Sequence, residues 1–281
     1  MEPNFKEVER IIAAALAEDI GIGDITAELL IPEKATANLA FITRQEIVMC
    51  GGTIVPKVFA YLDSTIESTI HIPDGMTVPA GTKLITAQGF ARTILTAERV
   101  ALNLLQRMSS VATLTSHYVK AVRDTTATIL DTRKTMPGLR ELDKYAVRTG
   151  GGRNHRMRLD DGILIKDNHI ALCGGITQAL AHAQKGNKAR LPLEIECDSL
   201  EQVQEAIAAG AKSILLDNMN IAALRQAVEW VAGRASLEAS GNVTIDTVAK
   251  IASTGINFIS VGRLTHSALN VDIGLDIALN Y

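Results

Sequence analysis

The hydrophobic pattern divides the chain into two regions of different character. In the first, residues 7–19 carry apolar side chains at helical spacing, and Asn4 ahead of them is a predicted helix cap. A turn at residues 73–75 and three short apolar segments predict strands at residues 37–43, 65–71 and 83–88. A long helical stretch is then predicted over residues 96–122. The first region therefore mixes helix and strand.

From residue 127 the chain repeats strand, loop and helix. Strand-like segments occur at residues 127–130, 162–166, 191–196, 213–216, 235–239 and 257–261. Amphipathic helices are predicted between the later strands, at residues 200–209, 221–231 and 245–252. This alternation is typical of parallel βα units. Six strands are fewer than a closed (β/α)8 barrel contains, so either two are hidden or the barrel is incomplete.

Polar residues or glycines follow each of these strands. In strand order they are Asp131 and Arg133, Lys166, Glu196, Asp217, Ser240-Gly241, and Gly262. The carboxyl ends of parallel barrel strands meet at one rim, where the βα loops build the active site. Chance could place one or two charges in this way, but a succession over six strands indicates a functional site.

The stretch from Asp131 to His169 is cationic, with nine Lys/Arg against six acids in a chain of net charge -3. It also contains three consecutive glycines at residues 150–152. Arginine forks, lysine charges and accessible backbone N–H groups suit a ligand with several phosphates or carboxylates. Ordinary surface charge is the default interpretation, but the setting in glycine-rich turns and at strand ends argues against it for Arg133, Lys134, His155, Arg156 and Lys166.

Acidic residues at two strand ends indicate oxygen ligands. Glu194 and Glu196 lie two apart in a strand, so their side chains share a face, and Asp217 ends an apolar strand. Such carboxylates suit hydroxyls or Mg²⁺. Structural alternatives stay open: an ion pair with a lysine for either glutamate, and a helix cap for Asp217. Gly241 and Gly262 each precede a predicted helix start. The free backbone N–H groups and the dipole of a helix N-terminus favour a phosphate, although each glycine alone also suits a turn.

Composition narrows the function classes. The chain is 47% hydrophobic and 21% charged, as in globular proteins, and its net charge argues against general nucleic-acid binding. Cys50, Cys173 and Cys197 are too scattered for a disulfide framework or a structural zinc site. The sequence lacks a signal-peptide core and any membrane-spanning apolar run, so we expect a cytoplasmic protein with no membrane partner. Dinucleotide, Walker and GxSxG motifs are missing, which argues against dehydrogenases, kinases and serine hydrolases.

At these residues the chain resembles the quinolinate phosphoribosyltransferases (decarboxylating), also called nicotinate-nucleotide pyrophosphorylases (carboxylating). The trio DTRKT, GGGxNHR and LIKDNH, in this order, is highly specific. The motifs run nearly end to end: DIGIGDIT at 19–26, AERVALNLLQ at 97–106, DTRKTMPGLR at 131–140, KYAVRTGGGRNHR at 144–156, LIKDNH at 164–169, EIECDSLEQ at 194–202, LLDNM at 215–219, EASGN at 238–242 and VGRLTHS at 261–267.

The resemblance implies an α/β fold in three parts. An N-terminal α/β sandwich would span residues 1–110, and an open, incomplete α/β barrel with the active site would span residues 111–266. A C-terminal helix over residues 267–281 would pack back on the first domain. It further implies a homodimer or hexamer whose active sites are shared between subunits. The implied reaction joins quinolinate and phosphoribosyl pyrophosphate, with Mg²⁺, to give nicotinate mononucleotide, pyrophosphate and CO₂ for NAD biosynthesis.

The resemblance also implies roles for single residues. Quinolinate would be bound by Arg133, His155 and Arg156, and by Arg99 from the neighbouring subunit. The helical spacing alone predicts that Arg99 lies on a solvent-exposed face of its helix together with Asn103 and Gln106. Phosphoribosyl pyrophosphate would be held by the catalytic set Lys134, Lys166, Glu196 and Asp217, with Glu196 and Asp217 as metal ligands. Its 5′-phosphate would be cradled by Ser240, Gly241 and Gly262.

Four residues depart from the pattern of the family: Met136, Arg158, Asn242 and Arg263. None of them removes a charged ligand. Three rival functions stay open at this point: a phosphoribosyltransferase acting on another aromatic acid such as nicotinate, a non-catalytic sensor of phosphorylated metabolites, and a metal-dependent aldolase or isomerase.

Overall fold

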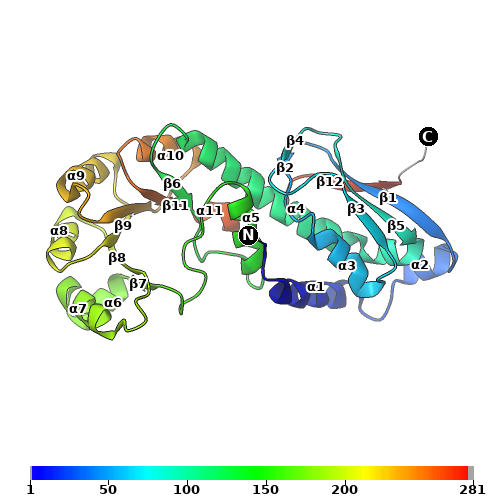
Figure 1. Ribbon diagram of the computed structural model, residues 1–281, viewed down its shortest axis with the longest axis horizontal. Coiled ribbons are helices and arrows are strands. Elements are labelled where there is room, and N and C mark those ends of the chain that lie inside the picture. The colour runs from blue at the N-terminus through cyan, green and yellow to red at the C-terminus, as the bar shows by residue number, and fades with distance from the viewer. Residues whose placement is uncertain (1, 278–281) are drawn as a thin grey trace. The chain divides into compact units, whose positions relative to one another are not determined.

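The computed structural model describes residues 2–277, which form two compact units (Figure 1). The described residues of the first unit are 2–116, 135–151 and 267–277, and the second unit contains residues 117–134 and 152–266. The long helix α4 (Ala91–Val122) begins in the first unit and ends in the second.

An antiparallel sheet forms the framework of the first unit, in the strand order β12-β1-β5-β3. Its strands are β1 (Thr36–Thr43), β3 (Glu67–Ile70), β5 (Lys83–Phe90) and β12 (Ile273–Ile277). A second sheet pairs β2 (Ile47–Val48) with β4 (Thr77–Val78). The helices that lie wholly in this unit are α1 (Phe5–Ile20), α2 (Ile25–Leu30), α3 (Ile54–Leu62) and α5 (Arg140–Thr149).

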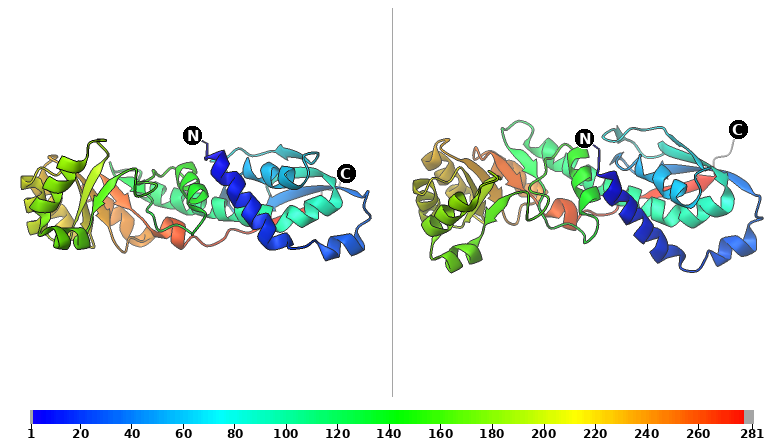
Figure 2. Two further views of the ribbon diagram at one scale, coloured as in Figure 1. Left: turned by 90° about the horizontal axis from the view of Figure 1, so that it is seen from below. Right: turned by 60° about the horizontal axis from the view of Figure 1, so that its bottom comes forward.

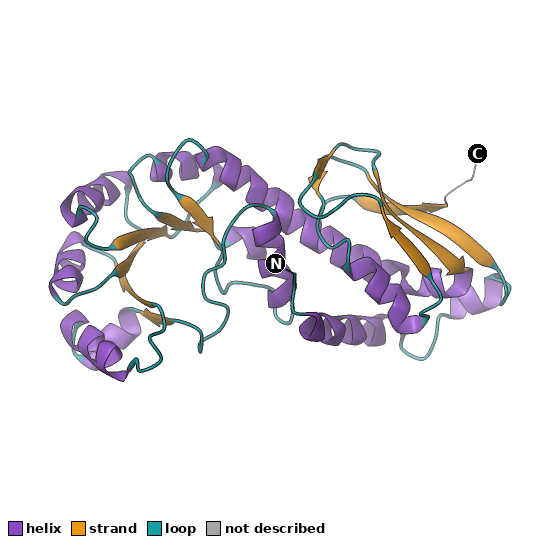
Figure 3. Ribbon diagram, in the orientation of Figure 1, coloured by secondary structure: helices purple, strands orange, loops and turns teal. Residues whose placement is uncertain are grey.

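Helices and sheet share one apolar core in this unit. The apolar stripe predicted for α1 is buried, and the Asn4 side chain caps this helix by accepting a 3.2 Å hydrogen bond from the Lys6 N–H. Phe41 of β1 and Phe59 of α3 are fully buried, with ring centroids 6.1 Å apart in a tilted arrangement that aromatic pairs favour. The first unit is therefore the predicted α/β sandwich (Figure 3).

The second unit is an open barrel of six parallel strands in the order β6-β11-β10-β9-β8-β7. The strands are β6 (Thr128–Leu130), β7 (Ile163–Ile165), β8 (Leu193–Cys197), β9 (Ser213–Asp217), β10 (Ser236–Ser240) and β11 (Phe258–Ser260). Among the described residues β6 and β7 are the sheet edges and do not pair with each other. The prediction of an incomplete barrel is thus confirmed.

Helices follow the strands of the barrel, and most of them lie on the outside of the arc that the strands form (Figure 3). They are α6 (Asp167–Cys173), α7 (Ile176–Gly186), α8 (Leu200–Ala208), α9 (Ile221–Val231), α10 (Ile245–Ala252) and α11 (Arg263–His266). Polar caps fix where several begin. The Ser199 hydroxyl accepts from the Gln202 N–H, the Asn220 side chain accepts from the Ala223 N–H, and Thr244 opens a capping box.

The predicted C-terminal helix over residues 267–281 is wrong for the described residues, because residues 273–277 form strand β12. The sequence IGLDI alternates apolar and non-apolar residues with a period of two, which suits a strand. β12 pairs antiparallel with β1, with Leu275 opposite Phe41, and the two strands lie side by side in Figure 1 and in the right-hand view of Figure 2. Residues 278–281 lie outside the described part of the chain.

The structure also assigns the segment 135–151 to the first unit, although the sequence interpretation placed it in the barrel domain. Two polar contacts within the first unit hold α5 of this segment. Asp143 accepts hydrogen bonds of 2.8 and 2.9 Å from Arg107, and the Tyr145 hydroxyl donates to Asp74 at 2.8 Å. A partner more than thirty residues away decides the position of this helix, so local sequence does not indicate it.

Asp143→Asn is expected to lower the free energy of unfolding by about 3 kcal/mol, because breaking a buried ion pair leaves a charge uncompensated. Asp143 is fully buried and also accepts a hydrogen bond from the Met136 N–H at 3.2 Å. Urea unfolding followed by circular dichroism measures the change. The matched control is Glu7→Gln, which breaks the exposed pair with Arg10 and should cost less than about 1 kcal/mol. Equal losses in the two variants would contradict the assignment.

Candidate active site

A pocket of about 600 Å³ opens at the carboxyl ends of the barrel strands in the second unit. The parallel order of the sheet brings these strand ends to a common rim. Nine of the residues that the sequence analysis singled out line this pocket: Arg133, Lys134, His155, Arg156, Lys166, Glu196, Asp217, Ser240 and Gly241.

Two further predicted residues, Arg99 and Gly262, do not line the pocket. Arg99 is an exposed residue of α4 in the first unit, and its role at a partner's site stays a prediction. Gly262 packs against a pocket residue, because a Cβ at this position would lie 3.1 Å from Lys134 Cδ and 3.2 Å from the His266 ring. Glycine at 262 therefore leaves the space that the Lys134 side chain needs.

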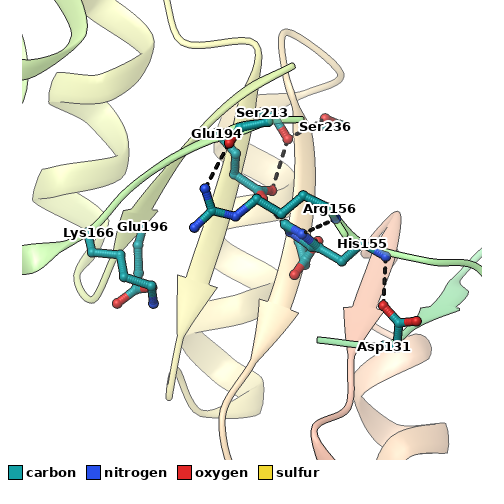
Figure 4. A network of polar contacts seen from close by, with 10 residues as sticks. Asp131, His155, Arg156, Lys166, Glu194, Glu196, Ser213 and Ser236 are labelled. Atoms are coloured by element: carbon teal, nitrogen blue, oxygen red, sulfur yellow. Dashed lines mark hydrogen bonds and ion pairs between the residues drawn. The ribbon is translucent and has the colours of Figure 1, made fainter. Parts of the chain in front are cut away.

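Lys166 and Glu196 form an ion pair between neighbouring strands, with 2.6 Å from Nζ to Oε2 (Figure 4). Lys166 directly follows β7, and Glu196 is the fourth residue of β8, which pairs with β7 in parallel. The lysine side chain is 45% exposed and the glutamate side chain 15%. The alternative interpretation of Glu196, an ion pair with a lysine, therefore involves a lysine that is itself a predicted site residue.

The loops after β9 and β10 meet at Asn218. Asp217, the last residue of β9, accepts a 2.7 Å hydrogen bond from Asn218 Nδ2. The Asn218 backbone N–H donates to the Ser240 carbonyl at 2.9 Å. Gly241, with φ of 94°, approaches so closely that a Cβ there would lie 2.1 Å from Asn218 Oδ1, so only glycine fits. These contacts fix the acidic strand end relative to the Ser240-Gly241 loop.

His155 is held by three contacts within the protein (Figure 4). Its backbone N–H donates to Asp131 Oδ1 at 2.9 Å, and its Nδ1 accepts from the Arg156 N–H at 2.7 Å. Its Nε2 lies 2.9 Å from Glu194 Oε2. Because Nδ1 accepts a hydrogen bond, the neutral ring carries its proton on Nε2 and donates it to Glu194. Both ring nitrogens are thus engaged, while the residue still lines the pocket.

Polar contacts continue from His155 into the barrel core. Glu194 Oε1 accepts from the Ser213 hydroxyl at 3.0 Å, and Ser213 Oγ lies 3.2 Å from Ser236 Oγ (Figure 4). Glu238 Oε2 lies 3.7 Å from His155 Nε2. Burial, together with the charge of Glu194, raises the pKa of Glu238 to about 8. The raised pKa favours the protonated form of Glu238, which lessens the repulsion between the two facing carboxyl groups.

Arg133 and Arg156 place two cationic groups in the pocket. Burial and the neighbouring charge of Arg133 lower the pKa of Arg156, and the charges of Asp161 and Glu194 oppose this shift. Arg156 Nη1 donates to the Gly162 carbonyl at 2.8 Å, which orients its guanidinium. Two like charges held near each other repel, and a bound dianion relieves the repulsion. The pair therefore suits a ligand with two carboxylates.

Glu196 and Asp217 fit a Mg²⁺ site, because Mg²⁺ is usually held by one or two carboxylates together with waters and substrate phosphates. Both residues line the pocket from the adjacent parallel strands β8 and β9. His155, Glu194 and Glu238 also have ligand-type atoms within 4.8 Å of one another. Their contacts with each other form the network described above, and we assign that group to hydrogen bonding.

The structure adds pocket residues that the sequence analysis did not place in the site: Thr132, Leu164, Leu215, Asn218, Glu238, Asn242 and Ser260. Glu238 could have been found, because it lies two residues before Ser240 in one strand and so shares its face. Asn218 and Asn242 directly follow predicted residues. Leu164 and Leu215 carry no signal that separates them from other strand leucines.

Two family models together match almost the whole chain. Residues 24–109 match the N-terminal domain of quinolinate phosphoribosyl transferase, and residues 111–276 match its C-terminal domain.

Relatives and solved structures agree with the family models. A probable nicotinate-nucleotide pyrophosphorylase (carboxylating) of Bacillus subtilis is 39% identical over 277 residues, covering 99% of this chain and 96% of the relative. A mitochondrial quinolinate phosphoribosyltransferase (decarboxylating) of Nicotiana glauca is 40% identical, covering 96% and 82%. The structure of the nicotinate-nucleotide pyrophosphorylase from Francisella tularensis matches with a TM-score of 0.94 at 40% identity, covering 98% of both chains. With matching domains, fold and length, this chain belongs to the quinolinate phosphoribosyltransferase family.

Proposed function

We propose that the protein transfers the phosphoribosyl group of phosphoribosyl pyrophosphate to quinolinate with loss of CO₂, a step of NAD biosynthesis that yields nicotinate mononucleotide and pyrophosphate. The observation that carries this proposal is the division of charge in one pocket. Arg133 and Arg156 supply cationic groups for a dicarboxylate, while Glu196 and Asp217 lie near the carboxyl ends of neighbouring strands in the same pocket. The arginines would bind the carboxylates of quinolinate. The acidic residues would stabilise the positive charge that develops on the ribose.

The reaction requires no nucleophile from the protein. The pyridine nitrogen attacks the anomeric carbon of the ribose as the bond to pyrophosphate breaks. Positive charge develops at this carbon, where Glu196 and Asp217 would stabilise it. Lys134 and Lys166 would neutralise the departing pyrophosphate. The resulting pyridinium then accepts the electron pair released when the adjacent carboxylate leaves as CO₂, and the ring carbon takes up a proton.

Mg²⁺ is the proposed cofactor, and Glu196 and Asp217 are the residues that would hold it. A bound Mg²⁺ would help to neutralise the negative charge of the pyrophosphate. Ser240 and Gly241 would contact the 5′-phosphate near the first turn of α10, whose N–H groups favour an anion. Gly262 would leave room for the side chain of Lys134, which is a residue proposed to neutralise the pyrophosphate.

We further propose a homodimer, or a hexamer built from dimers, in which Arg99 of one subunit serves the pocket of its partner. The exposed position of Arg99 on α4 supports this role. Within the described residues no helix is long and apolar enough to cross a membrane. The three cysteines are free thiols, which agrees with the proposed cytoplasmic location.

Purified protein given quinolinate, phosphoribosyl pyrophosphate and Mg²⁺ should release nicotinate mononucleotide and CO₂ in equal amounts, because decarboxylation follows each transfer. Chromatography of the nucleotide and trapping of labelled CO₂ measure the two products. Leaving out any one component should abolish both. Equal or better turnover of nicotinate would instead indicate a related transferase, and binding of phosphoribosyl pyrophosphate without product would indicate a sensor.

Arg133→Ala should raise the KM for quinolinate and lower kcat/KM by more than about tenfold, because losing the partner of a desolvated charge costs about 2–5 kcal/mol. Steady-state kinetics with quinolinate varied measure the effect. The matched control is Arg153→Ala, which removes an exposed arginine of the same cationic stretch that does not line the pocket. It should change kcat/KM by less than about twofold. A loss below tenfold for Arg133→Ala would count against its role.

Co-expression of Arg99→Ala and Arg133→Ala chains tests whether the active site is shared. Each variant alone should be nearly inactive. In mixed dimers one of the two sites combines a partner's intact Arg99 with an intact Arg133, so random pairing should restore about a quarter of the wild-type activity. If Arg99 served the pocket of its own chain, no mixed dimer would contain an intact site. Activity no higher than that of the single variants would therefore exclude sharing through Arg99.

A further inference from the structure

A row of side-chain amides connects the loop after β10 to the acidic end of β9. Asn242 Nδ2 donates to Asn218 Oδ1 at 3.2 Å, and Asn218 Nδ2 donates to Asp217 Oδ2 at 2.7 Å. Both asparagines line the pocket. The Asn218 backbone N–H also donates to the Ser240 carbonyl. Asn218 therefore contacts both the carboxylate and the loop proposed to hold the 5′-phosphate.

Both asparagines have left-handed backbone conformations, with φ of 54° at Asn218 and 50° at Asn242. Most side chains are disfavoured there, glycine is free of strain, and asparagine is the residue that most often tolerates it. Glycine would therefore serve the backbone at least as well at both positions. What the asparagines add is the amide contact, and Asn242 is one of the four departures from the family pattern seen in the sequence.

The amide row constrains how Asp217 presents its carboxylate. One of its oxygens, Oδ2, is held by the Asn218 amide, which leaves Oδ1 for a ligand in the pocket. The carbonyl end of the same amide receives the Asn242 donor. A shift of the loop after β10 is thus passed to the orientation of Asp217 through a single planar group.

We propose that Asn218 and Asn242 form an amide clamp, a pair of positioning residues that holds Asp217 and the Ser240-Gly241 loop in register for phosphoribosyl pyrophosphate. The clamp rests on the proposed function, because it orients groups assigned to that substrate. It acts on the phosphoribosyl half of the pocket and leaves the arginine pair unaffected.

The test uses glycine substitutions, which keep the left-handed backbone and remove only the amides: Asn218→Gly, Asn242→Gly and the double variant. Asn242→Gly should weaken binding of phosphoribosyl pyrophosphate with Mg²⁺ by about 3- to 10-fold, as expected for one hydrogen bond. Asn218→Gly should weaken it more, because it removes both contacts. The double variant should bind like Asn218→Gly, because the Asn242 contact passes through Asn218.

Calorimetric titration with phosphoribosyl pyrophosphate and, without metal, with ribose 5-phosphate gives a readout that does not depend on turnover. The KM for quinolinate should stay within about twofold of wild type, since the clamp does not touch Arg133 or Arg156. The matched control is Asn220→Ala, in the same loop. Its amide caps α9 through the Ala223 N–H at 3.0 Å and does not line the pocket. This variant should lower the Tm but leave both dissociation constants unchanged.

Losses in the single variants that add fully in the double variant would overturn the clamp, as would wild-type affinities in all three. A comparable loss of affinity in Asn220→Ala would also overturn it, because general loosening of the loop would then suffice. A wild-type protein that binds no phosphoribosyl pyrophosphate would instead overturn the proposed function. Tight binding by the wild type with no effect of the glycine variants would leave that function standing and refute the clamp alone.

Discussion

The barrel buries ionisable side chains at its centre, and the site depends on their mutual hydrogen bonds. Asp131 is fully buried, Glu238 is 2% exposed and Glu194 is 9% exposed. An unpaired buried charge costs several kcal/mol, so such groups persist only when they are partnered or neutralised. His155 connects them: its backbone binds Asp131, and its ring binds Glu194 and lies near Glu238. The segment with His155 and Arg156 is therefore held in place by buried residues of the barrel interior.

This anchoring explains how a charged pocket can have a definite shape. Long cationic side chains lose much conformational entropy when they are held in place. Arg156 is held through the Gly162 carbonyl, and Lys166 through Glu196. Lys134 lies against Gly262, a position where any larger residue would crowd it. Arg156 and Lys166 are thus oriented before a ligand arrives, which lowers the entropy cost of binding.

The sequence predicts the barrel well because its strands are short apolar runs whose polar residues fall at one end. The period of two placed Glu194 and Glu196 on one face, and parallel order then brought the strand ends together. Features set by distant partners were not predictable in the same way. Residues 273–277 form a strand because β1 offers a free edge, and α5 joins the first unit because Arg107 holds Asp143. That Glu238 faces the pocket could be predicted from the sequence, because it lies two residues before Ser240 in one strand. Its raised pKa could not be predicted, because it depends on burial that only the fold supplies.

The floor and the rim of the pocket are fixed by different kinds of interaction, with different consequences. The floor consists of buried, charge-assisted contacts such as His155 with Glu194, and breaking one leaves a charge without compensation. The rim, including Asn218 and Asn242, consists of exposed neutral amides whose hydrogen bonds contribute about 1 kcal/mol each. Each rim contact therefore contributes little to the free energy of the folded state, whereas the floor keeps its geometry only with all of its partners in place. The same difference explains why a departure from the family pattern such as Asn242 can occur at the rim, because a neutral side chain there costs little folding free energy. A substitution in the floor would instead leave a buried charge without its partner.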